Sequence, residues 1–189
     1  MGRIRYGLKN LYYATATDDG LGNLTYATPV QLPGAKSISL TAAGDSLDEY
    51  ADDVRWFHLD SNMGYDGTLE FEDTAAADTF QKTVLGQTTD TKDVIWESSD
   101  DKPIEFALMG EFSLAGGNTE TGKRFALLRC VISRPELTGS TKENAITVQT
   151  NTVNISALPR INDTLVKAVA DSDSAAYSGW FSAVPTVNS

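Results

Sequence analysis

The sequence predicts a mainly β fold, an antiparallel β-sandwich or barrel with one flanking α-helix and a long acidic loop. Apolar and polar residues alternate with a period of two through most of the chain, which is typical of half-buried strands. One segment has helical spacing and caps, and one segment holds most of the acidic residues. We predict a single domain over residues 1–189, with an acidic strand–loop–strand excursion at about 45–66 and a docking segment at about 172–189.

The alternation defines the early strands. Ile38 and Leu40 share one face of the first clear run, with serine and threonine on the other face. Leu69 and Phe71 alternate in the same way with threonine and glutamate. Each pattern predicts a strand with one face toward a core and one toward solvent.

The later strands differ in how many faces are apolar. Residues 105–114 alternate between large apolar side chains and glutamate or serine, so one polar face is expected. Residues 125–132 are apolar on both faces apart from Arg129, as in a central strand. Residues 146–155 change parity near Gln149–Asn151, which predicts a bulge or a change of sheet there.

A helix is predicted directly after the strand at Leu69 and Phe71. Asp73 or Thr74 caps its start, it runs to about Leu85, and Gly86 ends it. Its apolar stripe consists of Ala76, Phe80 and Val84.

Near the C-terminus, residues 172–174 cap a short turn that carries three aromatic residues. Tyr177, Trp180 and Phe181 have i, i+3, i+4 spacing. Three aromatic side chains in five residues are unfavourable in water, so we expect this segment to dock on the sheet or on a neighbouring molecule.

Charge is distributed very unevenly. The net charge is −11, yet residues 45–78 hold eleven acidic side chains against Arg55 alone, a net charge of −10 in 34 residues. A stretch that includes Lys123, Arg124 and Arg129 is basic. The acidic segment is either a solvated surface loop or a strip that meets basic residues of another subunit or lines a space that repels polyanions.

Composition excludes several functional classes. An acidic chain does not grip nucleic acid by neutralising phosphates, and no polybasic segment is present for a membrane surface. Cys130 is the one cysteine, so no internal disulfide forms. The N-terminal residues lack the apolar run of a signal peptide, and we expect a soluble protein that matures in a reducing cytoplasm.

Catalytic patterns are weak, and we predict that the protein is not an enzyme and has no cofactor or metal. Glu70 and Glu72 share a strand face at a spacing that suits glycoside hydrolysis, but exposed strands commonly carry such pairs. His58 is the one histidine and has no second histidine to complete a zinc site. We expect it to be structural, packed or at an interface.

Several segments together resemble a family of phage major tail proteins, the tail tube subunits of long, non-contractile tails. The most specific is Gly7-Leu8-Lys9-Asn10-Leu11-Tyr12-Tyr13-Ala14, which resembles the first strand of that family. Tyr50-Ala51-Asp52-Asp53 is similar to its acidic strand–loop motif. Pro135, Thr141-Lys142, residues 146–150 and 152–155, and Trp180-Phe181-Ser182-Ala183-Val184 resemble its later segments in the same order.

The resemblance implies a structural virion protein that self-assembles into stacked, hexameric rings around a tape measure protein. Such a tube also joins tail terminator and tail tip proteins, and DNA passes through it during ejection without sequence-specific binding. The protein would be made and assembled in the host cytoplasm and reside in the virion tail. Its acidic residues are then expected to face the lumen or contact the next ring: Asp45, Asp48, Glu49, Asp52 and Asp53. A complementary basic interface is predicted at Lys123, Arg124 and Arg129.

Two other functions fit parts of the sequence. A carbohydrate- or receptor-binding β-sandwich of a virion or cell surface would use clustered exposed aromatic residues such as Trp56, Phe57 and Tyr65. A hydrolase would use Glu70 and Glu72.

Overall fold

The computed structural model describes residues 3–116, 119–141 and 150–187. It is mainly β, with 53% strand and 6% helix in an antiparallel arrangement, which confirms the predicted fold class. The elements in chain order are β1 (Ile4–Asp18), β2 (Leu24–Tyr26), β3 (Val30–Gln31), β4 (Ala35–Ala43), β5 (Ser46–Ala51), β6 (Val54–Asp60), β7 (Gly64–Glu72), α1 (Ala75–Leu85), β8 (Thr88–Thr89), β9 (Ile95–Trp96), β10 (Phe106–Gly116), β11 (Thr119–Ile132), β12 (Thr150–Ala157) and β13 (Lys167–Asp171).

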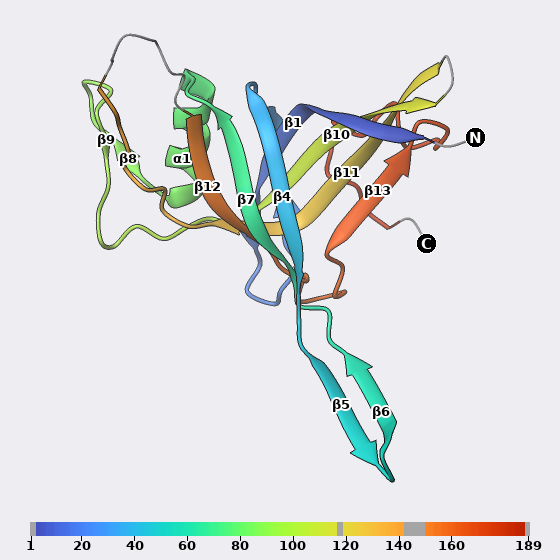
Figure 1. Ribbon diagram of the computed structural model, residues 1–189. Coiled ribbons are helices and arrows are strands. Elements are labelled where there is room, and N and C mark those ends of the chain that lie inside the picture. Colours follow the sequence, from blue (N-terminus) through green and yellow to red (C-terminus); the bar gives the residue numbers. More distant parts are fainter. Residues whose placement is uncertain (1–2, 117–118, 142–149, 188–189) are drawn as a thin grey trace.

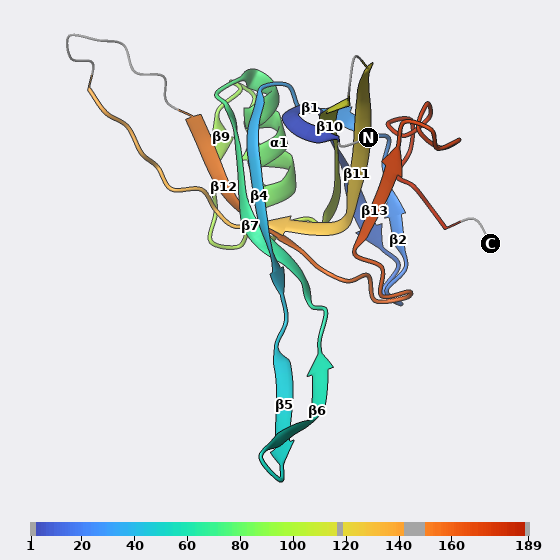
Figure 2. The same cartoon turned by 45° about the vertical axis from the view of Figure 1, so that its right-hand side comes forward.

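Most strands form one curved sheet (Figure 1), and their hydrogen-bonded order is β2-β1-β10-β11-β12-β7-β4. Strand β11 is central, as its two apolar faces predicted, and it pairs with β10 along one edge. Its other edge is shared, because residues 123–127 pair with β13 and residues 130–132 pair with β12. The two branches diverge from this point, so β13 and β4 stand on opposite sides of an open space (Figures 1 and 2).

Helix α1 covers part of the sheet and forms the main core with it. The Thr74 hydroxyl accepts a hydrogen bond from the Ala77 amide at 3.1 Å, and Gly86 ends the helix with a φ of 72°. Both predicted caps are therefore confirmed. Phe80 and Val84 are buried as predicted, whereas the third fully buried position of the stripe is Ala77 and Ala76 is only half-buried.

A second core lies on the other face of the sheet, under the C-terminal segment. Phe106 and Leu108 of β10 point into the main core, whereas Ala107 and Met109 pack with Trp180 in the second core. The expectation of one polar face on this strand was therefore wrong. The sequence alternation did not reveal that a segment more than 70 residues later covers that face.

Some predictions fall on residues that the structure does not describe. Residues 142–149 include Lys142 and the start of the predicted strand at 146–155, so the predicted bulge near Gln149 lies outside the described residues. Cys130 is fully buried, and burial raises the pKa of its thiol. The one helix in the described parts of the chain is too short to span a membrane.

Candidate assembly surface

Strands β5 and β6, with their connections at residues 45–62, form an arm that projects from one end of the sheet (Figures 1 and 2). The two strands pair with each other in a separate two-stranded sheet, and every residue of both is exposed. A two-stranded hairpin is at best marginally stable by itself in water. We therefore expect a surface of another molecule to support an arm of this length.

One face of the arm is mainly apolar, whereas the other, charged face carries Asp48, His58 and Asp60 together with the exposed Trp56. Directly opposite residues of an antiparallel pair share a face, so Leu47 lies beside Leu59 and Glu49 beside Phe57. Leu47, Phe57 and Leu59 are 51, 48 and 55% exposed, which leaves this apolar face uncovered. The sequence analysis named Phe57 only as a possible carbohydrate-binding residue and did not single out Leu47 or Leu59, because the pairing of β5 with β6 decides which residues share this face.

Two glycines hold the base of the arm. Gly44 and Gly64 have φ angles of 142° and 101°, and a Cβ at either position would come within 1.9 Å of a carbonyl oxygen. Between them, the Ser61 amide donates to the carbonyl oxygen of Asp45 at 3.0 Å, and the Asp45 amide donates to the Ser61 hydroxyl at 3.0 Å. These backbone conformations and hydrogen bonds turn the chain out of the main sheet into the arm and then back into the sheet.

All five acidic residues predicted as a contact or lumen surface lie on this arm. Asp45 is at the base, and Asp48 and Glu49 are in β5. Asp52 and Asp53 form the two-residue turn at the tip with φ angles of 53° and 61°, the conformation of a type I′ hairpin turn. Their role in assembly stays a prediction. The chain re-enters the main sheet at Gly64, slightly before the expected limit of the excursion.

His58 lies on the charged face of the arm between two carboxylates. Its Nδ1 contacts Asp48 Oδ1 at 2.5 Å, and its Nε2 contacts Asp60 Oδ2 at 3.1 Å. Arg55 also approaches Asp48, at 3.7 Å. The hydrogen bonds with Asp48 and then Asp60 raise the pKa of His58 above its usual 6.5.

We expect NMR titration of His58 to give a midpoint above 6.5, and Asp48→Asn to lower it more than Asp60→Asn does. Because the folded pKa is the higher one, this ion-pair cluster stabilises the arm fully below about pH 6.5 and its contribution is lost as pH rises through the raised pKa. Amide exchange of β5 and β6 is therefore expected to speed up at alkaline pH beyond the intrinsic pH effect. A midpoint at or below 6.5 would contradict this geometry.

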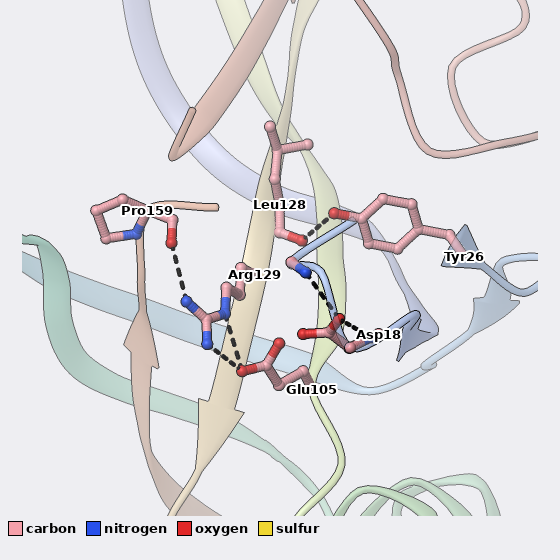
Figure 3. A network of polar contacts seen from close by, with 8 residues as sticks. Asp18, Tyr26, Glu105, Leu128, Arg129 and Pro159 are labelled. Atoms are coloured by element: carbon pink, nitrogen blue, oxygen red, sulfur yellow. Dashed lines mark hydrogen bonds and ion pairs between the residues drawn. The ribbon is translucent and has the colours of Figure 1, made fainter. Parts of the chain in front are cut away.

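Two of the three predicted interface cations are already bound within the chain. Arg129 pairs with Glu105 at 2.6 Å and donates to the Pro159 carbonyl oxygen at 3.1 Å (Figure 3). Arg124 pairs with Glu111 at 2.9 Å. Lys123 is 43% exposed and has one distant partner, Asp171 at 4.0 Å. Of the three, Lys123 is the side chain most available to another molecule.

The predicted C-terminal docking residues pack against the sheet. Trp180 is 5% exposed and its Nε1 donates to the Phe125 carbonyl oxygen at 3.2 Å. Phe181 stacks on Tyr12 with ring centroids 4.6 Å apart. Tyr177 lies under Arg124, whose guanidinium carbon is 3.8 Å from the ring centroid. The segment forms consecutive turns rather than a helix.

The residues suggested for the two alternative functions either have partners within the chain or lie on different elements. Glu70 accepts from Thr150 and Ser37, which holds its pKa below the usual value, whereas a general acid needs a raised one. Glu72 pairs with Lys36 at 3.2 Å. The aromatic residues suggested for carbohydrate binding are divided between the arm and the start of β7. In the described part of the chain, no group of three or more His, Cys, Asp or Glu side chains is placed to hold a metal ion.

No family model matches the chain, and neither does any curated protein. Among solved structures, it is similar to the tube-terminating cap of the anti-feeding prophage, with a TM-score of 0.46 and 10% identity over 89% of this chain and 93% of that one. It is also similar to a chain of the baseplate of the anti-feeding prophage, with a TM-score of 0.40 and 11% identity over 89% and 98%. Neither TM-score reaches 0.5, so no family is assigned from these likenesses.

Proposed function

We propose that this chain is a non-enzymatic structural protein of a phage-like tail. Its subunits would assemble into stacked, six-membered rings, and those rings would form a tube through which DNA passes. The proposed partners are other copies of the chain, a tape measure protein, and the terminator and tip proteins of the tail. The proposed location is the virion.

The arm is the observation that carries this proposal. It is a fully exposed hairpin with an uncovered apolar face, and it projects away from the core that would otherwise stabilise it (Figure 2). An element of this kind is stable when a second subunit covers it, and contacts between different surfaces of identical subunits generate rings or filaments. Acidic side chains along the arm would also keep DNA from sticking wherever they face a bore.

Unpaired strand edges give a second reason to expect assembly. Within the described sheet, β4 pairs with β7 alone and β13 pairs with β11 alone. An exposed edge is a template for pairing with another chain. Contacts with other copies of the chain would cover these edges.

Removing the arm tests the proposal. Ala43 and Gly64 are directly paired across β4 and β7, so an Asn-Gly type I′ turn can replace residues 44–63 and join the two strands as a hairpin. We expect this variant to fold, with unchanged thermal melting of the sheet, but to form no tubes by negative-stain electron microscopy under conditions in which the intact chain does.

A matched control shortens the other exposed hairpin. Asp90 and Val94 lie opposite each other in this hairpin, so residues 91–93 between them are replaced by Asn-Gly, and tubes should still form. Tubes from the variant without the arm, or an intact chain that is absent from the tubes of virions, would overturn the proposal.

A further inference from the structure

A groove lies in the open space between β4 and β13. It encloses about 690 Å³, and its lining comes from β1, β4, β7, β10, β11 and β13. The groove is a continuation of the main core, because Ile38, Leu40 and Phe112 line it and also pack against that core. Helix α1 does not line it, so no helix or strand among the described residues covers this part of the core.

Three cations surround the apolar floor. Arg5, Lys123 and Lys167 line the groove, and no acidic residue is among the described residues that line it. Arg5 lies over the Phe112 ring at 4.6 Å, and Lys167 Nζ contacts the Tyr65 hydroxyl at 2.9 Å. Neither contact neutralises a positive charge. The groove therefore favours an occupant that is apolar on one face and negatively charged.

The arm has this chemistry. Between residues 45 and 60 it carries six acidic side chains and one arginine, a net charge of −5 with His58 neutral. Its apolar face consists of Leu47, Phe57 and Leu59, with Glu49 beside Phe57. The arm is itself a pair of strands with free edges, and the groove is flanked by the unpaired edges of β4 and β13.

An arm cannot enter the groove of its own subunit. It leaves the end of the sheet at which β4 ends and β7 begins and points away from the body (Figures 1 and 2). The arm continues the direction of β4, which forms one side of the groove. A second copy displaced along that direction would bring its arm alongside the groove.

We propose that the groove between β4 and β13 receives the arm of a second copy of this chain, in a head-to-tail contact. The apolar face of the arm covers Ile38, Leu40 and Phe112, and its carboxylates meet Arg5, Lys123 and Lys167. This inference rests on the proposed self-assembly and names the two surfaces that carry it. Because the two surfaces differ, each contact leaves one free arm and one free groove, and repetition gives an open filament when the rotation between copies does not close a ring.

Charge reversal on each surface tests the contact. The groove variant is Lys123→Glu/Lys167→Glu, which changes the net charge of the groove lining from +3 to −1. The arm variant is Asp45→Lys/Glu49→Lys/Asp60→Lys, which changes the net charge of residues 45–60 from −5 to +1 with His58 neutral. In sedimentation velocity at low salt, each variant alone should self-associate at least about ten-fold more weakly than the unmodified chain, because like charges then meet. An equimolar mixture should recover association as a one-to-one copolymer, since each reversed arm meets a reversed groove and each native arm a native groove.

The control variant Lys92→Glu/Lys102→Glu carries the same charge change on exposed residues away from both surfaces and should associate like the unmodified chain. Thermal melting of every variant checks that the fold is retained. A groove variant that associates normally, or a mixture that recovers nothing, overturns the inference but leaves the proposed self-assembly intact. An unmodified chain that stays monomeric at every concentration overturns both. A small anionic molecule that native mass spectrometry detects on the unmodified chain but not on the groove variant, with association unchanged, would also overturn it.

Discussion

Phe80→Ala is expected to lower the free energy of unfolding by about 3–5 kcal/mol. Phe80 is completely buried and makes edge-to-face contacts with Tyr13, Phe71 and Phe106, at centroid distances of 4.8, 6.0 and 5.4 Å. An eleven-residue helix has little stability of its own, so α1 depends on this contact to stay on the sheet. Alanine would leave a cavity between the helix and three strands.

Urea denaturation of the monomeric protein, followed by tryptophan fluorescence, measures this loss. Phe80→Leu is the matched control, because it retains much of the apolar volume and should cost clearly less. A loss below about 1 kcal/mol for Phe80→Ala would mean that the helix is not held by this side chain.

Arg124→Ala is expected to cost about 3–5 kcal/mol and to release the C-terminal segment from the sheet. Arg124 holds the buried carboxylate of Glu111, donates to the carbonyl oxygen of Tyr177, and lies 4.7 Å from the Phe181 ring centroid. The Glu111 side chain is only 5% exposed, so removing the arginine leaves a buried charge with weaker partners, Lys9 and Asn10 at 3.4 Å.

The pH dependence distinguishes this mechanism from a simple packing loss. Burial acts to raise the pKa of Glu111, but hydrogen bonds from Arg124, Asn10 and Lys9 outweigh it and hold the pKa below its usual 4.5. The interaction therefore stabilises the native chain above about pH 4.5 and is lost as pH falls through the lowered folded pKa. Without Arg124 one of the hydrogen bonds that lower this pKa is lost, so the difference in free energy of unfolding between the variant and the native chain should narrow as pH falls.

The surface pair Lys36–Glu72 provides a control, because both side chains are well exposed, and Lys36→Ala should cost less than about 1 kcal/mol. Limited proteolysis then reports on the C-terminal segment. The role assigned to Arg124 would be contradicted if the C-terminal segment of Arg124→Ala stays protected from proteolysis and the stability difference from the native chain does not change with pH.

Local sequence signals were sufficient where neighbouring residues decide the structure. The helix could be placed from Thr74, Phe80 and Gly86, because caps and helical spacing act within a few residues. The central position of β11 followed from its two apolar faces. The concentration of acidic residues at 45–53 is a property of the sequence itself, and it marked the segment that forms the arm.

Partners far along the chain could not be predicted in this way. Arg124 and Arg129 look like surface cations in the sequence, but the fold places a glutamate beside each. Arg124 of β11 pairs with Glu111 of β10 because the two residues are opposite each other in the sheet. Arg129 also donates a hydrogen bond to the carbonyl oxygen of Pro159, 30 residues later. Because of these contacts within the chain, Arg124 and Arg129 are less available than Lys123 for an interface with another molecule.

The sequence by itself determined that this protein is mainly β, where its helix begins and ends, and which segment carries its negative charge. These features depend on periodicity, capping and composition, which are local. Only the tertiary structure decided that the acidic segment is a free-standing arm with an apolar face, that the C-terminal aromatic residues cover a second core, and that β13 and β12 diverge to leave a cationic groove. Those features depend on the pairing register and on contacts between residues distant in sequence, which no single segment encodes.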